Sequence, residues 1–85
     1  MMWNLAIVEI ENNGDTFLGY VTEDTGSNFY YDSIPAMMKN GKQPIEYDLI
    51  TAKGIIKELG ECGVHLIISP AIKVLTTSYR IKWED

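Results

Sequence analysis

The 85-residue sequence has little cysteine, histidine or proline: one Cys, one His and three Pro. A single cysteine, Cys62, excludes an intramolecular disulfide and a paired-cysteine metal site. Because small secreted domains usually depend on disulfides, this scarcity favours a reducing compartment. No apolar run has the length of a transmembrane helix, and Glu9 and Glu11 interrupt the N-terminal apolar stretch, which is therefore not a signal peptide. We expect a cytoplasmic protein without membrane association.

The sequence also lacks the motifs that assemble catalytic groups, metals or phosphates. No HExxH, DxDxDG, GxGxxG, GxxxxGK[ST] or GxSxG string occurs. His65 stands in an apolar stretch, where a lone histidine is more often structural than catalytic. Cys62 stands at the end of an expected helix, where the helix dipole opposes a thiolate. We predict a non-enzymatic protein with no catalytic residues, no cofactor and no metal site.

Positive charge is missing from the first half of the chain. Residues 1–38 contain six acidic residues and no Lys or Arg, whereas residues 39–85 contain seven basic and six acidic residues, which gives the net charge of −5. Direct nucleic-acid binding is disfavoured, because phosphate contacts need a basic surface. The asymmetry indicates either a partner with a basic surface or a solvated acidic face that maintains solubility.

Two strands are predicted at the N-terminus, Trp3–Glu11 and Thr16–Glu23, both rich in β-branched and aromatic residues. Asn13-Gly14 between them is typical of a type I′ turn, which needs positive φ at both residues. That turn would place Ile10 opposite Phe17. A second turn, at residues 24–27, leads to a third strand, Asn28–Asp32, so that the three strands form an antiparallel meander.

The predicted register gives the hairpin one apolar face and one mixed face. Ala6, Val8 and Ile10 share the apolar face, while the mixed face combines two glutamates with apolar residues: Leu5, Ile7, Glu9, Glu11, Leu18 and Tyr20. A half-exposed sheet normally alternates apolar and polar residues, so the mixed face needs an explanation. Three remain open: later elements cover both faces, the sheet curls into a small barrel, or this face meets a partner.

Two helices are predicted after the meander. Ser33–Gly41 suits a short helix, with Ser33 as its N-cap and Gly41 at its end. Asp48–Gly63 has the clearest helical period, with Asp48 as N-cap and an apolar stripe that contains Leu49, Ala52, Ile55, Ile56, Leu59 and Cys62. Gly54 in its interior costs roughly 1 kcal/mol relative to alanine, which predicts a close approach of the helix backbone to the sheet.

The C-terminal part is predicted to add two to three strands. Val64–Ser69 is almost entirely apolar, so we expect it to lie centrally in the sheet. Ala71–Leu75 and Tyr79–Trp83 suggest a final hairpin, and one long bent strand is the alternative. The whole chain, residues 1–85, is then a single α+β domain: an antiparallel β-meander of three N-terminal strands, a short helix, one main amphipathic helix packed on the sheet, and two to three C-terminal strands.

The leading functional hypothesis is a small acidic protein-binding module that occupies a basic, nucleic-acid-handling surface of a partner protein. Phage-encoded inhibitors of host defence, including anti-CRISPR proteins, often have this small, acidic, motif-free format, and a phage-encoded protein would act in the host-cell cytoplasm. Tyr20 is a candidate anchor among acidic residues. The predicted partner-binding residues are Glu9, Glu11, Asp15, Tyr20, Glu23, Asp24 and Asp32.

Two other classes of function remain open. In the first, the chain is a homo-oligomeric structural or accessory protein, for example a two-fold dimer closed by an apolar sheet face. In the second, it is a small-ligand or nucleotide-binding sensor whose pocket would be formed by Tyr20, Tyr30, Tyr31 and His65.

Overall fold

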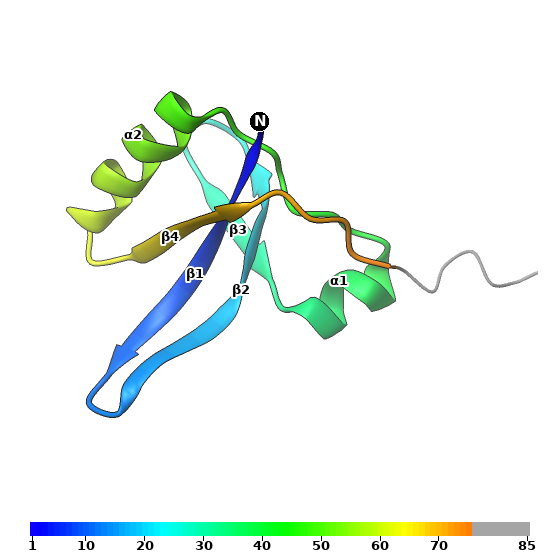
Figure 1. Ribbon diagram of the computed structural model, residues 1–85, viewed down its shortest axis with the longest axis horizontal. Helices are drawn as coiled ribbons and strands as arrows, with labels where there is room; N and C mark the ends of the chain where they lie inside the picture. Colours follow the sequence, from blue (N-terminus) through cyan, green and yellow to red (C-terminus); the bar gives the residue numbers. More distant parts are fainter. Residues whose placement is uncertain (76–85) are drawn as a thin grey trace, which may run out of the picture.

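Figure 1 shows a computed structural model of the protein, which describes residues 1–75. It combines a four-stranded antiparallel sheet with two helices, which confirms the predicted α+β class. The elements follow one another as β1 (Trp3–Glu11), β2 (Gly14–Asp24), β3 (Phe29–Asp32), α1 (Ile34–Asn40), α2 (Leu49–Gly60) and β4 (His65–Pro70). In space the strand order is β3-β2-β1-β4, so the N-terminal strand lies between β2 and the last described strand.

The predicted meander is present, since β1 pairs with β2 and β2 pairs with β3, both antiparallel. The prediction that Val64–Ser69 lies centrally is wrong. Its strand, β4, pairs with β1 alone among the described strands and forms an edge of the sheet. The apolar sequence did not signal burial on both faces: Leu66 is buried, whereas His65 and Ile67 are exposed.

The segment after β4 is not the strand that we predicted for Ala71–Leu75. It has no regular structure, because polar side chains bind its backbone in place of a neighbouring strand. The Ile72 amide donates to Asn4 Oδ1 at 2.9 Å. Val74 accepts a hydrogen bond from the Gln43 side chain and donates one to it. The other half of the expected hairpin, Tyr79–Trp83, lies outside the described residues.

The turn between β1 and β2 differs from the predicted one. Glu11 pairs with Gly14, so Asn12 and Asn13 form the connection. Gly14 has a φ of +120°, but neither asparagine has positive φ, which excludes a type I′ turn at Asn13-Gly14. As a result the predicted register is wrong: Val8, not Ile10, lies opposite Phe17.

A bulge at Leu18 then decides which side chains share a face of the sheet. Ile7 lies opposite Gly19 and Val8 opposite Phe17, so Leu18 is the extra residue on β2. Beyond the bulge, Leu5 and Val21 join the core beneath α2. The core face therefore carries Leu5 and Ile7 of the predicted mixed face, and α2 covers this apolar part. The placement of Tyr20 on that face is wrong, because Tyr20 lies opposite Ala6 and so shares the other face of the sheet.

Helix α2 packs against the sheet with Ala52 and Ile55 buried and with Ile56 and Leu59 partly buried. These residues contact a core that also contains Leu5, Val21, Tyr47 and Leu66. The helix lies along the side of the sheet on which β4 forms the edge (Figure 1). The predicted apolar stripe is thus confirmed in its middle, but both of its ends, Leu49 and Cys62, are exposed.

Gly54 does not mark the close helix–sheet contact that the sequence predicted. It is exposed, and a Cβ atom added there would meet no atom within 4 Å. We therefore expect Gly54→Ala to raise the free energy of unfolding by about 0.5–1 kcal/mol, since alanine loses less backbone entropy in a helix. Urea denaturation measures this change, and a destabilised variant would contradict the placement of Gly54 on the outer side of α2.

Both helix starts follow the sequence prediction, but the second helix ends at Gly60 and not at the predicted Gly63. Ser33 caps α1, where its hydroxyl accepts from the Ala36 amide, and Asp48 caps α2, where Oδ1 accepts from the Thr51 amide at 2.8 Å. The hydrogen bonds from Thr51 lower the pKa of Asp48. These caps fix where each helix begins, so the connector of residues 42–47 has a defined path between them.

That connector joins the two ends of the described chain. Tyr47 exchanges two backbone hydrogen bonds of 2.8 Å with Trp3, and the Ile45 amide donates to the Val21 carbonyl. Asn4 is fully buried, and its side-chain amide donates to the Ile45 carbonyl at 2.9 Å. One buried side chain therefore links β1, the connector and the segment after β4.

Candidate functional site

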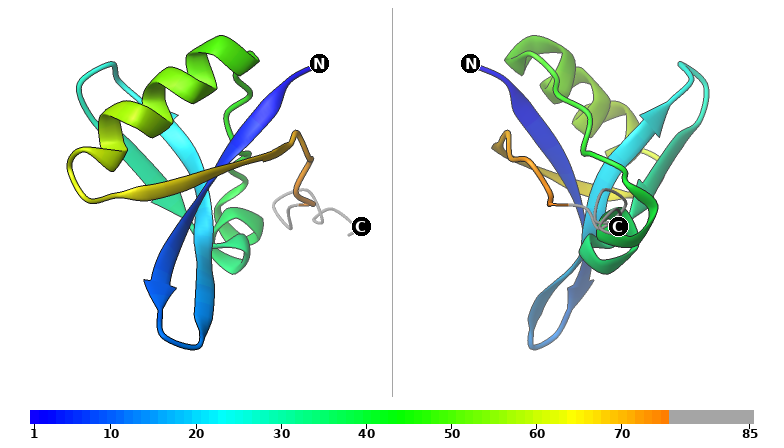
Figure 2. Two further views of the ribbon diagram at one scale, coloured as in Figure 1. Left: turned by 60° about the vertical axis from the view of Figure 1, so that its left-hand side comes forward. Right: turned by 90° about the vertical axis from the view of Figure 1, so that its right-hand side faces the viewer.

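The β1–β2 hairpin extends beyond the rest of the sheet. β4 pairs with residues 3–8 of β1, and β3 pairs with residues 20–24 of β2. The end of the hairpin, residues 9–17, thus lies outside both pairings, and all nine residues are exposed. We call this segment the hairpin arm. It projects away from both helices in each view (Figures 1 and 2).

Three of the predicted partner-binding residues lie on the hairpin arm. Glu9 lies opposite Thr16 and Asp15 opposite Ile10, so the two glutamates share one face of the arm and Asp15 lies on the other. Glu11 accepts a hydrogen bond of 2.9 Å from the Thr16 hydroxyl. Because residues 1–38 contain no Lys or Arg, no cation of the arm itself neutralises these carboxylates.

The other predicted acidic residues lie elsewhere and two of them have internal partners. Asp24 accepts hydrogen bonds from the Tyr47 hydroxyl at 2.9 Å and from the Gly26 amide at 2.8 Å. Burial, and then the hydrogen bond to Asp24, raise the pKa of Tyr47. Asp32 accepts from the Thr22 hydroxyl and lies 3.5 Å from the ammonium group of Lys42.

Glu23 is exposed at the end of β2 opposite to the hairpin arm. Eight residue steps of extended strand separate it from the arm carboxylate at Asp15, a distance of about 26 Å at the usual rise per residue. The structure therefore brings Glu9, Glu11 and Asp15 to one projecting segment. It does not bring Glu23, Asp24 or Asp32 to that segment.

An apolar patch lies on the face of the hairpin turned away from α2, which is the face that the sequence analysis predicted to be apolar. Ile10, Phe17 and Ile67 are 53%, 45% and 49% exposed on this face. The predicted anchor Tyr20 is half-buried beside them, with its ring 5.2 Å from that of Phe17 in an edge-on contact. The sequence analysis did not place Ile67 on this face, because that position depends on the long-range pairing of β4 with β1.

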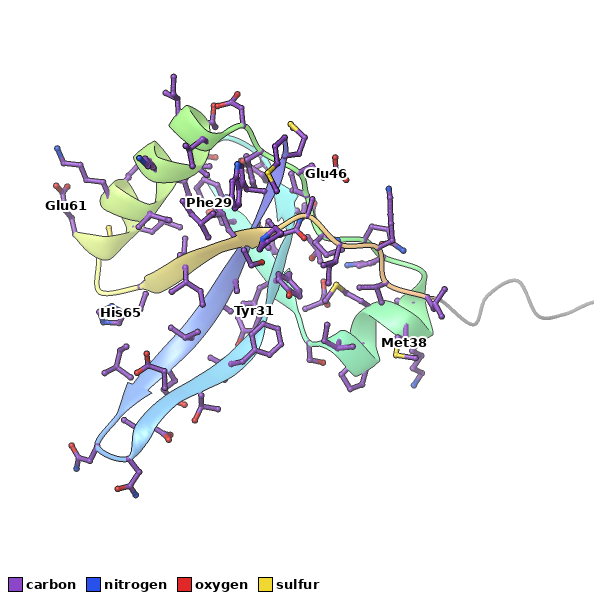
Figure 3. All side chains as sticks on the ribbon, in the orientation of Figure 1. Phe29, Tyr31, Met38, Glu46, Glu61 and His65 are labelled. Carbon is purple, nitrogen blue, oxygen red and sulfur yellow. The ribbon has the colours of Figure 1, made fainter. Side chains whose placement is uncertain are left out.

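A groove of about 380 Å³ lies where the hairpin arm leaves the body of the protein. We call it the arm groove. Ile7 and Leu18 line it from the hairpin, Val64 and His65 line it from the start of β4, and Glu9 adds the carboxylate of the lining. His65 lies at this corner, below the C-terminal end of α2 (Figure 3). Tyr20, Tyr30 and Tyr31, which were expected to share a pocket with His65, do not line this groove.

The described part of the chain contains neither a cluster of metal-binding side chains nor a membrane-spanning helix. Within residues 1–75 no group of three or more His, Cys, Asp or Glu side chains gathers where it would hold a metal ion. None of the described helices has the length and apolar character needed to cross a bilayer. Cys62 is a free, exposed thiol.

No protein-family model, curated protein sequence or solved structure matches the chain. The functional argument therefore rests on the geometry of the hairpin arm and the arm groove.

Proposed function

We propose that the protein is a non-enzymatic binding module whose hairpin arm occupies a basic, nucleic-acid-handling surface of a partner protein and thereby inhibits it. The observation that carries the proposal is the arm: nine exposed residues with three carboxylates and no Lys or Arg, extended beyond both helices. A projecting two-stranded arm has the shape to enter a groove, and its charge opposes that of a surface built to hold phosphates.

The arm would imitate part of a nucleic-acid backbone. Glu9 and Glu11 are alternate residues of one strand, so their Cα atoms lie about 7 Å apart, close to the spacing of successive phosphates. Complementary charge of this kind mainly accelerates the encounter of two proteins. Affinity would come from apolar anchors, for which Ile10 and Phe17 on the other face of the arm are available.

The internal hydrogen bonds of Asp24 and Asp32 reduce the set of acidic residues that we propose to contact the partner. These two carboxylates serve the β2–β3 region of the fold, and Glu23 is remote from the arm. We assign the primary contact to Glu9, Glu11 and Asp15. The small acidic format matches that of phage-encoded inhibitors of host defence, and we propose action in the cytoplasm, that of the host cell if a phage encodes the protein.

We expect the double variant Glu9→Lys, Glu11→Lys to recover at least tenfold less partner than the wild type in affinity capture from a lysate of the source cell. Reversal of two charges replaces attraction to a basic surface by repulsion, and tenfold corresponds to about 1.4 kcal/mol. The matched control is Glu58→Lys, Glu61→Lys, which reverses two exposed charges at the end of α2. Equal recovery by the two double variants would contradict the proposal.

The same capture experiment addresses the nature of the partner surface. A short DNA duplex or heparin added to the captured complex should release the partner, because both compete for a surface that binds phosphates or sulfates. Circular dichroism establishes that both double variants remain folded. Retention of the partner at a saturating concentration of either polyanion would show that the arm binds a different kind of surface.

A homodimer is the second candidate function, and the apolar patch favours it. Ile10, Phe17 and Ile67 are each about half exposed on one face of the sheet, which a two-fold related copy would cover. A dimer that persists at micromolar concentration and is insensitive to salt in gel filtration would favour this alternative over the acidic-arm proposal. A monomer would remove it.

A further inference from the structure

We infer that the arm groove is a binding site for a guanidinium group on an aliphatic stem, and that its occupant in the complex is an arginine side chain of the partner. This inference rests on the proposed function, because a basic partner surface is what supplies the arginine. The proposed function depends on the overall charge and shape of the hairpin arm. The inference adds one specific contact, in which a pocket holds the side chain and a carboxylate pairs with its charge.

The walls of the groove fit the stem of such a side chain. Ile7 and Leu18 on the hairpin and Val64 before β4 present aliphatic surface to the cavity. Long basic side chains commonly lay their methylene groups along apolar surface while the charged end stays near water. The arm groove therefore offers the stem a place in which its apolar surface leaves solvent.

The charge of the groove fits the end of that side chain. Glu9 is the acidic residue of the lining, and among the described residues that line the cavity there is no Lys or Arg. A carboxylate accepts two parallel hydrogen bonds from a guanidinium, whose planar fork matches it better than a compact ammonium does. The same carboxylate would repel a phosphate, so the groove is unsuited to a nucleotide.

The groove also has room for such a side chain. Its volume of about 380 Å³ lies near the lower end of the range of roughly 300–1,000 Å³ that ligand pockets cover. Gly63 is part of the lining and carries no side chain that would fill the groove. A side chain of the partner can thus enter as the hairpin arm docks.

The direct test is an NMR titration of the full-length protein with n-butylguanidinium, which has the charged group and the stem of arginine. We expect saturable shifts of the methyl signals of Ile7, Leu18 and Val64, with a millimolar dissociation constant. n-Butylurea, a neutral molecule of nearly the same shape, should bind at least fivefold more weakly, and n-butylammonium should fall between the two. Equal binding of the charged and neutral molecules would overturn the inference.

Matched variants locate the charge that matters. Glu9→Gln should weaken the binding of n-butylguanidinium at least fivefold. Glu11 lies two residues further along the same face of the strand and outside the groove, so Glu11→Gln should change the dissociation constant by less than twofold. Equal weakening by the Glu9 and Glu11 variants would show a diffuse charge effect and overturn the assignment.

The outcomes of this experiment and of the capture experiment distinguish failure of the arm groove from failure of the proposed function. Loss of the partner in Glu9→Lys, Glu11→Lys without any n-butylguanidinium binding would refute the groove and leave the acidic arm standing. Binding of n-butylguanidinium at the groove together with unchanged capture would refute the proposed function. The occupied groove would then be a site for a free organic cation and not for an arginine of a partner, which would also overturn the inference.

Discussion

Replacement of Gly19 by alanine is expected to lower the free energy of unfolding by about 3 kcal/mol, the upper part of the usual range for overpacking. Gly19 is buried in β2 just after the Leu18 bulge. A Cβ atom there would collide with the carbonyl oxygen of Asp32, lie 2.7 Å from its carbonyl carbon and lie 3.0 Å from the Ser33 nitrogen. These are backbone atoms at the junction of β3 and α1, so no side-chain rotation relieves the collision.

The measurement is urea denaturation of Gly19→Ala beside Gly54→Ala, which introduces the same methyl group into open space. The two variants should change stability in opposite directions. Amide hydrogen exchange should also become faster in the first turn of α1, because Ser33 caps that helix. A Gly19 variant within 0.5 kcal/mol of the wild type would mean that β2 does not approach the β3–α1 junction as closely as described.

Replacement of Asn4 by leucine is expected to lower the free energy of unfolding by about 3 kcal/mol. Leucine has a similar shape but removes the donor to the Ile45 carbonyl and the acceptor of the Ile72 amide. Asn4 is fully buried and both hydrogen bonds are partly buried, so each backbone group would lose its partner where access to water is restricted. An unsatisfied buried group costs about 1–3 kcal/mol, and two are created here.

Hydrogen exchange distinguishes this mechanism from a general loss of packing. The Ile72 amide should exchange much faster in Asn4→Leu than in the wild type, beyond the change that global destabilisation causes. Asn40→Leu, at an exposed position, serves as the control and should change stability by less than about 0.5 kcal/mol. Unchanged protection of Ile72 would show that its amide does not depend on Asn4.

Local chemistry made much of the fold predictable from the sequence. Ser33 and Asp48 each have a side-chain oxygen that caps a helix, and the period of Ala52, Ile55, Ile56 and Leu59 specifies which side of α2 is apolar. Such signals act over a few residues, so the sequence contains them in full. They fixed the α+β class and the positions of both helices.

Long-range pairing could not be predicted in the same way. The register of the hairpin depends on which of two turns the NNG sequence adopts, and the Leu18 bulge shifts it again. The edge position of β4 depends on its pairing with β1, nearly the whole described chain away. The prediction of close helix–sheet packing at Gly54 was wrong because a glycine in a helix is as compatible with open solvent as with close packing.

The candidate site was predictable in part, for the same reason. The absence of Lys and Arg from residues 1–38 identified Glu9, Glu11 and Asp15, because a charge count needs no structure. The hydrogen bonds of Asp24 and Asp32 depend on Tyr47, Thr22 and Lys42, which only the fold brings near. The arm groove likewise joins residues of the hairpin to residues that follow α2.

The central position of β1 has a consequence for biosynthesis. One edge of β1 pairs with β2, which is synthesised directly after it. The other edge pairs with β4, which is synthesised more than 50 residues later. On the ribosome, a meander of β1, β2 and β3 would leave residues 3–8 of β1 without their partner strand until His65–Pro70 has emerged. A nascent chain halted before β4 exposes an unpaired apolar edge, so ribosome-bound chaperones should bind such arrested chains far more strongly than the completed protein.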